Sequence, residues 1–259
     1  MINFYTFYSG SKGNCTFISD KDTNILIDAG VSASKIINSL SDIGVSPEEI
    51  DAILITHEHS DHVSGVKVLS DKFSIPVYAN ENTMSKLVTS GNVSERFSRV
   101  FVSGSSFLLR SANIRSFKTP HDSIESVGYI VEMDNKKFGI ATDTGCITKP
   151  MLSALAKCEA VLIESNHDVE MLKNGKYPYV LKRRILSDNG HLSNENCAWL
   201  ATQLAIWGTK RIALGHLSEN NNTPEKAFAA TEKMFLENNI KIGDDVRLIV
   251  ADKSKICEI

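Results

Sequence analysis

The chain has 259 residues, of which 42% are hydrophobic and 23% charged, a composition typical of a water-soluble globular protein with a substantial core. Its formal net charge of -3 excludes binding to nucleic acid through an overall positive field, so any polyanion site must be a local basic patch. The five cysteines are scattered and form no C-x-x-C pair, which argues against a disulfide framework and a thiolate zinc site.

The first ten residues, MINFYTFYSG, lack the basic region and the long apolar region of a signal peptide. No later apolar stretch approaches the roughly 20 residues that are needed to span a bilayer. We therefore expect a cytoplasmic protein with no membrane partner.

Short strands and three helices are expected in the N-terminal third of the chain. Strands are predicted at residues 2–10, 15–20, 24–30, 52–56 and 75–80, and helices at 31–40, 65–73 and 82–88. Between them, Ser46 can cap a helical turn in which Pro47 takes the first position and Glu49 completes a capping box.

Strands and helices continue to alternate in the rest of the chain. Strands are predicted at residues 100–109, 113–121, 126–133, 137–145, 160–165, 211–218 and 246–252. Helices are predicted at residues 149–158, 193–207 and 223–239. In the last of these, Thr223 is a suitable N-cap and Pro224 takes the first helical position.

This order of elements favours an α+β fold of two stacked mixed sheets with helices outside. A weak internal repeat supports two similar halves, because ILIDAG (25–30) and IATDTG (140–145) both end a strand in Asp-x-Gly. No linker and no low-complexity stretch divides the sequence. Residues 1–259 are therefore expected to form a single domain.

Three histidines and an aspartate lie within six positions in HEHSDH, directly after a predicted strand. His57 and His59 are two residues apart, so on extended backbone both imidazoles point the same way and can bind one ion. Asp61 and His62 follow where the chain turns into a helix, and they can reach a second ion. Imidazole and carboxylate without thiolate suit zinc, manganese or iron. The alternative is a solvated, histidine-rich turn.

Further candidate ligands follow apolar or strand-like runs elsewhere in the chain. These are His121, Asp143 and His216. Each alone could be a structural residue, but together they supply the ligands that HEHSDH lacks for a two-metal site.

HEHSDH with the downstream His, Asp and His resembles the metallo-β-lactamase superfamily over nearly the whole chain. The segments that resemble its YycJ/WalJ-type branch are SGSKGN (9–14), ILIDAG, PHD (120–122), TDTG (142–145), ESNHD (164–168), GHLSNENCA (190–198) and GHLSENNN (215–222). The resemblance implies a four-layer αβ/βα sandwich with all metal ligands along one edge. It also implies two divalent metal ions per chain, zinc or manganese, with iron possible.

The resemblance assigns roles motif by motif. The ligands are His57, His59 and His121 for the first ion, Asp61, His62 and His216 for the second, and Asp143 for both. The nucleophile is then a hydroxide between the ions, because metals lower the pKa of bound water to roughly 7. Asp28 matches the superfamily's first motif and is expected to orient a ligand histidine. A turn cap is the alternative for that aspartate.

GHLSNENCAWLA resembles the HST block of ribonuclease Z, in which a histidine paired with a glutamate protonates the leaving oxygen. This resemblance makes His191 the general acid and Glu164 its orienting carboxylate, and with Asp61 they form the candidate catalytic set. Ser193 is the expected N-cap of a helix whose positive end would attract a substrate phosphate. His191 could instead be structural. His167 could be an active-site wall or a structural hydrogen bonder.

A basic run with interleaved aromatics, YPYVLKRR, precedes the candidate acid. Lys182, Arg183 and Arg184 in this run suit single strands or frayed duplex ends, with a solvated helical face as the alternative. SGSKGN lacks GxxxxGK[ST] and is therefore no P-loop. It is either a hairpin turn or a loop that places Ser11, Lys12 and Asn14 at the mouth of the site.

We expect a dinuclear-metal phosphodiesterase that acts on nucleic acid, most of all a DNA exonuclease of the type that the branch implies. The short interval between Asp143 and His216 leaves no room for a β-CASP cap domain. An RNA-processing nuclease and a small-molecule hydrolase of cyclic phosphodiesters or thioesters remain alternatives, although the latter has no use for the basic run. A metal-dependent sensor would need a crippled site, yet every expected ligand is present. Strand polarity and oligomeric state stay open.

Overall fold

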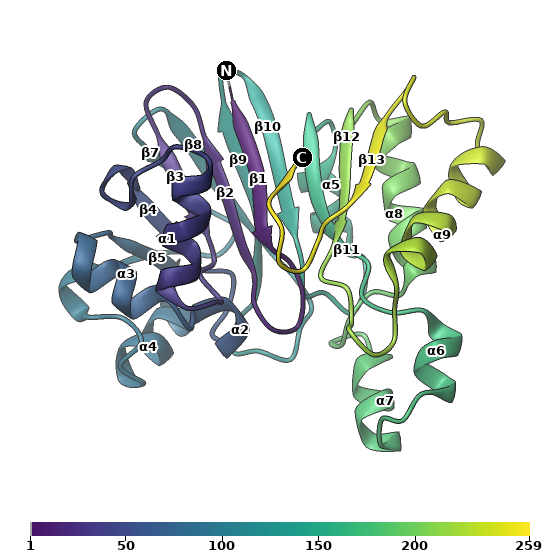
Figure 1. The fold of residues 1–259 in the computed structure, drawn as a ribbon, viewed down its shortest axis with the longest axis horizontal. Coiled ribbons are helices and arrows are strands. Elements are labelled where there is room, and N and C mark those ends of the chain that lie inside the picture. The colour runs from purple at the N-terminus through teal and green to yellow at the C-terminus, as the bar shows by residue number, and fades with distance from the viewer. Residues whose placement is uncertain (1) are drawn as a thin grey trace.

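The computed structural model describes residues 2–259, which form two seven-stranded sheets stacked face to face, with helices on the outer faces (Figure 1). The strand order is β14-β1-β2-β3-β4-β5-β6 in the first sheet and β13-β12-β11-β10-β9-β8-β7 in the second. In this described part of the chain, no helix is long and apolar enough to cross a membrane.

The first sheet is antiparallel from β14 to β3 and parallel from β3 to β6. Its strands are β1 (Asn3–Tyr8), β2 (Cys15–Ser19), β3 (Asn24–Ile27), β4 (Ala52–Leu54), β5 (Val77–Asn80), β6 (Ser98–Phe101) and β14 (Cys257–Glu258). The helices of this half are α1 (Ala33–Asp42), α2 (Ser60–Val63), α3 (Val66–Phe73) and α4 (Glu81–Thr89), with short 3-10 turns at Pro47–Glu49 and Glu95–Phe97. Apolar side chains of α1, α3 and α4 pack against the outer face of the sheet.

The second sheet is antiparallel from β7 to β10 and parallel from β10 to β13. Its strands are β7 (Ser106–Leu109), β8 (Ala112–Lys118), β9 (Val127–Met133), β10 (Lys136–Ala141), β11 (Ala160–Glu164), β12 (Arg211–Gly215) and β13 (Arg247–Val250). The helices of this half are α5 (Lys149–Leu155), α6 (Val169–Asn174), α7 (Tyr179–Ile185), α8 (Asn194–Ile206) and α9 (Pro224–Glu237). Helices α5, α8 and α9 cover the outer face, while α6 and α7 project from the lower end of the sandwich (Figure 1).

The main core lies between the two sheets. In β3, Ile25 and Ile27 join the cluster between the sheets, while Leu26 packs toward the helices, as the two-residue period of a strand requires. The Phe4 and Phe138 rings meet edge to face across this interior with centroids 5.7 Å apart. The predicted four-layer αβ/βα sandwich is confirmed.

The single strand that we predicted at residues 100–109 is wrong. β6 belongs to the first sheet and β7 to the second, and the chain crosses between them in a turn. In that turn Gly104 has a φ of +86°, which a residue without Cβ adopts readily. Helix α6 and strand β14 were not expected, and the strand predicted at 211–218 ends at Gly215.

The predicted helix starts are present. Ser193 and Thr223 each accept a backbone N–H three residues on, at 3.2 and 3.3 Å. The Glu49 carboxylate accepts the Ser46 backbone N–H at 2.7 Å. These contacts satisfy donors at the helix N-termini that have no partner within the helix itself.

Candidate metal centre and active site

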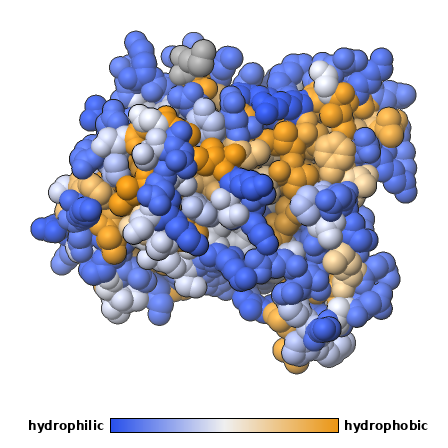
Figure 2. Space-filling view, viewed as in Figure 1, coloured by the Kyte–Doolittle hydropathy of each residue, from blue (hydrophilic) through white to orange (hydrophobic). Residues whose placement is uncertain are grey.

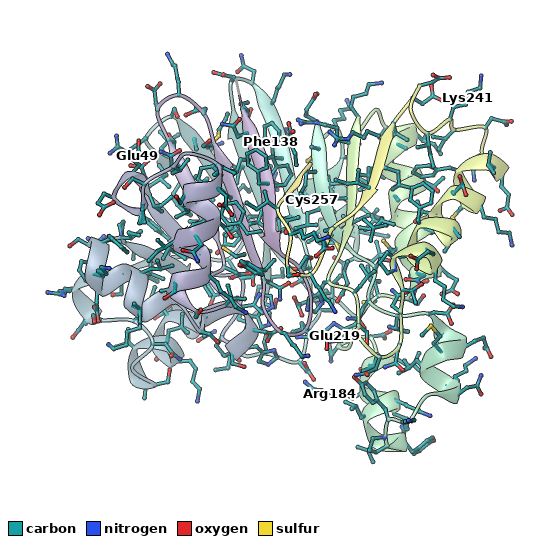
Figure 3. All side chains as sticks on the ribbon, viewed as in Figure 1. Glu49, Phe138, Arg184, Glu219, Lys241 and Cys257 are labelled. Carbon is teal, nitrogen blue, oxygen red and sulfur yellow. The ribbon has the colours of Figure 1, made fainter. Side chains whose placement is uncertain are left out.

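The candidate ligands lie in loops and in the short helix α2 at one end of the sandwich, the lower end in Figure 1. His57 follows β4, His121 follows β8, Asp143 follows β10 and His216 follows β12. The loops after the carboxyl ends of strands are where α/β sheets place their ligands. Arg184, labelled in Figure 3, lies at this same end.

The structure brings all seven predicted ligands together with Glu164 and His191. They form four overlapping groups, in each of which the ligand atoms lie within 4.8 Å of one another. The groups are His57, His59 and His121; His57, His62 and Asp143; Asp61, His62 and His216; and Asp143, Glu164, His191 and His216.

Asp143 belongs to two of these groups. Its Oδ1 is 3.7 Å from His121 Nε2, and its Oδ2 is 3.2 Å from His62 Nε2. Among residues 2–259, Asp143 Oδ2 and His216 Nε2 are buried and have no partner in hydrogen-bonding geometry. Such atoms cost about 1–3 kcal/mol each when left unpaired. A set of imidazoles and carboxylates with these orphaned atoms fits divalent metal ions.

The far sides of three ligand histidines are anchored. His62 Nδ1 lies 2.7 Å from Asp28 Oδ2, His121 Nδ1 lies 3.1 Å from the Gly190 carbonyl oxygen, and His216 Nδ1 lies 2.7 Å from Glu164 Oε1. These contacts turn each Nε2 toward the centre and fix the ring orientation. The position of Asp28 supports the orienting role that we expect for it.

Three residues at the centre have left-handed backbone conformations. Asp28, Asp143 and His216 have φ values of +59°, +55° and +54°. For residues other than glycine this conformation costs of order 1–3 kcal/mol and persists only where the surroundings enforce it. In both copies of the repeated Asp-x-Gly sequence, the aspartate therefore has a left-handed backbone conformation shortly after a strand ends, β3 in the first copy and β10 in the second.

Burial and neighbouring charges shift the pKa values of the centre strongly. Burial opposes the charge on Asp143, but His216 and His62 outweigh it and hold the pKa of the carboxyl well below its usual value. Burial, reinforced by His62, lowers the pKa of His57 well below normal. Burial also opposes a charge on His216, but Asp143, Asp61 and Glu164 raise its pKa to about 10. Protons therefore compete with cations for His216.

The SGSKGN loop is tied to the centre by backbone hydrogen bonds. The Asn14 N–H donates to the Asp61 carbonyl at 2.8 Å, and the Gly30 N–H donates to the Asn14 carbonyl at 2.8 Å. The Asn14 side chain is only 6% exposed, and its Nδ2 lies 3.1 Å from His62 Nε2. Asn14 thus lies among the ligands rather than at the mouth of the site, and substrate contact by it stays a prediction.

Substitution of Gly30 tests how closely the backbone after β3 must approach the backbone of Asp61. A Cβ on Gly30 would meet the Asp61 carbonyl oxygen at 1.6 Å, so Gly30→Ala has to push the Asp61 backbone away. We expect a loss of at least 1–3 kcal/mol in unfolding free energy, measured by urea titration, together with reduced metal content. Gly243→Ala is the control, because it adds the same methyl group in open space and only the φ of +95° opposes an alanine there, so we expect a smaller loss of stability and no loss of metal. Equal stability of the two variants would contradict the close approach.

Asp28 offers a test of ligand orientation. Asp28→Asn keeps the size of the side chain but removes the charge beside His62 Nδ1. Loss of such a supporting partner typically weakens metal affinity about 10–100-fold, and we expect that range in a competitive chelator titration. Unchanged affinity would leave Asp28 as a turn residue only.

His191 and Glu164 form the predicted pair. His191 Nδ1 lies 2.7 Å from Glu164 Oε1, the same oxygen that contacts His216, while Glu164 Oε2 accepts the backbone N–H of Thr144 at 2.9 Å. Burial opposes the charge on Glu164, but His191 and His216 lower its pKa to about 2. Burial likewise opposes a charge on His191, but Glu164 raises its pKa above the usual value. Glu164 therefore favours the protonated form of the His191 imidazole.

His191 has a 21% exposed side chain and lines a cavity of about 150 Å³. The other residues of this His191 cavity are Ser11, Asp122, Asn166, Tyr177, Leu181, Arg184, Ile185, Gly190 and Ser218. The His191 imidazole therefore faces an open space beside the candidate ligands.

The three cations of the predicted basic run lie on α7, and their side chains make different contacts. Arg184 lines the His191 cavity and is paired with Asp122. Lys182 Nζ donates to the Lys173 carbonyl at 2.7 Å, and the Arg183 guanidinium lies 5.9 Å from the centre of the Tyr179 ring. Of these three cations, only Arg184 lines this cavity, so its phosphate contact is the best supported of the three predictions.

Sequence reasoning missed Asp122 and could not place His167. Asp122 Oδ1 lies 3.4 Å from His121 Nε2, and the quoted PHD motif contained the signal for it. His167 is buried, and neither of its ring nitrogens has a hydrogen-bond partner among residues 2–259. Burial lowers the pKa of His167 to about 4, so its ring is neutral near pH 7. It does not line the His191 cavity.

A four-layer sandwich with His/Asp clusters at its strand ends defines a metallo-β-lactamase-fold protein with a divalent-metal centre. Residues 23–217 match the Beta-lactamase superfamily domain. The chain is 40% identical over 243 residues to the exodeoxyribonuclease WalJ of Streptococcus pneumoniae, across 93% of this chain and 90% of that protein. It is 36% identical over 246 residues to the exodeoxyribonuclease YycJ of Bacillus anthracis, across 94% of this chain and 92% of that protein.

The metallo-beta-lactamase fold protein YhfI of Bacillus subtilis has a similar solved structure, with a TM-score of 0.75, 13% identity and full coverage of both chains. The PqqB protein of Methylobacterium extorquens has a TM-score of 0.72 at 14% identity, again over both whole chains. These two structures support the fold alone. The chain belongs to the metallo-β-lactamase superfamily, in the group that contains WalJ and YycJ.

Proposed function

We propose that this chain is a dinuclear-metal phosphodiesterase, and specifically a DNA exonuclease. The observation that carries the proposal is the placement of His191 on the wall of an open cavity directly beside the ligand groups, in a chain 40% identical to an exodeoxyribonuclease. Residues 1–259 act as a single hydrolase domain. Because the proposed substrate is DNA, we also propose that the protein is cytoplasmic.

The seven candidate ligands would hold two divalent ions, zinc or manganese, with iron also compatible with the donor set. His57, His59 and His121 would hold one ion, Asp61, His62 and His216 would hold the other, and Asp143 would contribute to both. Bound ions would supply an activated water and neutralise charge on the phosphate. Asp28 orients His62.

His191 supplies the proton that the departing sugar oxygen requires, and Glu164 keeps the imidazole protonated and correctly turned. The cavity beside His191 takes the scissile phosphate, and Arg184 neutralises part of its charge. The amino end of α8, which begins at Asn194, adds a favourable partial charge.

The decisive experiment incubates the purified protein with end-labelled single- and double-stranded DNA and RNA, with Mn²⁺ or Zn²⁺ added. We expect metal-dependent, stepwise shortening of DNA that EDTA abolishes. Hydrolysis of cyclic phosphodiesters or thioesters without cleavage of DNA would contradict the proposal, and preferential shortening of RNA would replace DNA by RNA as the substrate.

A further inference from the structure

A second cavity, which we call the lysine cavity, adjoins the His191 cavity. It has a volume of about 180 Å³, and Ser11 lines both cavities. Four segments far apart in sequence form its walls, at residues 8–13, 31–35, 217–219 and 253–254. Glu219 marks this region in Figure 3, at the same end of the molecule as Arg184.

The lysine cavity has a positive balance of charge. Three lysines line it against one carboxylate, Glu219. Lys12 Nζ lies 2.7 Å from Glu219 Oε2 and Lys253 Nζ lies 3.9 Å from Glu219 Oε1, so one carboxylate is shared by two ammonium groups. Lys35 has no acidic partner within ion-pair distance among residues 2–259. Figure 2, viewed from the same side, shows mostly hydrophilic residues over the lower centre of this face.

The floor of the lysine cavity is closely packed, and it is joined by a backbone hydrogen bond to the candidate ligand Asp61. A Cβ on Gly13 would meet Val31 Cγ1 at 2.2 Å, so the loop lies tightly against the segment before α1. The next residue, Asn14, is hydrogen-bonded to the Asp61 backbone. On the other wall, the Tyr8 hydroxyl accepts from Ser39 Oγ at 3.4 Å. A group bound here would therefore sit at a set distance from the ligand Asp61.

We propose that the lysine cavity is a second phosphate subsite, which binds another phosphate group of the strand whose scissile phosphate lies in the His191 cavity. The proposal rests on the proposed function, because it concerns how that same substrate is held. A strand would run from Arg184 past His191 and over Ser11 to the three lysines. Positive side chains on both sides of the centre would position a polyanion in one register.

The test compares two double variants of the metal-loaded protein, Lys35→Gln with Lys253→Gln and, as the matched control, Lys210→Gln with Lys241→Gln. Figure 3 places Lys241 at the opposite end of the molecule. We expect the first pair to raise the KM for a labelled 12-nucleotide single strand about tenfold and to lower the slope of affinity against salt by about 0.7 per lysine. The kcat for DNA and the hydrolysis of bis(p-nitrophenyl) phosphate, which is too small to reach both cavities, should not change. The control pair should resemble the unaltered protein.

Binding of the same oligonucleotide, followed by fluorescence anisotropy in EDTA, separates the subsite from the nuclease activity. We expect the lysine pair to weaken this binding, and Glu219→Gln to strengthen it because a competing carboxylate is removed. If this pattern appears in a protein that does not cleave DNA, the subsite stands and the proposed function fails.

Oligonucleotides with phosphate or hydroxyl at each end identify the bound group. A terminal phosphate in the lysine cavity predicts an affinity advantage that the lysine pair abolishes, whereas an internal phosphate predicts equal losses for all four strands. Either pattern supports the subsite. Unchanged affinity and salt slope in the lysine pair, or equal losses on DNA and on the small ester, would overturn it.

Discussion

Asp143→Ala is expected to remove most of the bound metal and to slow phosphodiester cleavage by about 10³-fold or more. Asp143 is shared between ligand groups, and its Oδ2 is buried without a partner in hydrogen-bonding geometry. Metal ions supply several kcal/mol of transition-state stabilisation, and each 1.36 kcal/mol is a factor of ten in rate. Elemental analysis of the purified variant and DNA cleavage assays measure the two effects.

The control for this prediction is Asp22→Ala, which removes a carboxylate from an exposed turn. Its only ion pair among the described residues, with Lys21 at 3.6 Å, lies in solvent and contributes little. We expect this variant to keep its metal and its activity. Two ions retained in Asp143→Ala would rule out the shared-ligand role, and a loss confined to one ion would assign Asp143 to a single ion.

Most of the fold could be predicted because local pattern and overall architecture agree in this chain. In β3, alternate residues face the other sheet and the helices, so both faces had to be apolar, and residues 25–27, with the sequence ILI, have that pattern. The helices follow strands with clear starts, as at Ser193 and Thr223. When the local preferences of a sequence agree with the overall fold in this way, the fold can be predicted from the sequence.

The division between β6 and β7 could not be predicted from periodicity. VFVSGSSFLL contains two apolar runs around Ser-Gly-Ser, and a bulge within one strand would have the same pattern. Only the pairing partners distinguish the two cases, since β6 pairs with β5 and β7 pairs with β8. The partner of β6, β5, is separated from it by helix α4, and the partner of β7, β8, belongs to the other sheet. The residues of the turn alone do not reveal these pairings.

The candidate metal ligands could be predicted from the sequence, whereas the contacts of the candidate substrate-binding residues could not. Imidazoles and carboxylates at strand ends have one common explanation, whereas a cation on a surface helix has many. Arg184 is paired with Asp122, which lies 62 positions earlier, and Lys182 bonds to a neighbouring helix. The burial of Asn14 also depends on long-range contacts, with Asp61 and His62. Contacts of this kind leave no periodic signal in a sequence.

His191→Ala is expected to lower DNA cleavage about 10²–10⁴-fold while the metal content stays unchanged. A departing sugar oxygen is a poor leaving group and needs a proton, and general acid catalysis typically contributes a factor of that size. The leaving group of bis(p-nitrophenyl) phosphate departs as an anion and needs none. The variant should therefore hydrolyse that ester far better than it cleaves DNA. Parallel assays of both substrates, with elemental analysis, measure the difference.

Glu164→Gln should behave differently from His191→Ala, because Glu164 Oε1 lies 2.7 Å from both His191 Nδ1 and His216 Nδ1. Loss of its charge would weaken the acid and also loosen a candidate metal ligand, so both substrates and the metal content should suffer. His191 itself belongs to a group with Asp143 and His216, so a ligand role is the competing explanation. Equal losses on DNA and on the small ester in His191→Ala, or release of metal, would establish that role and remove the general acid from the mechanism.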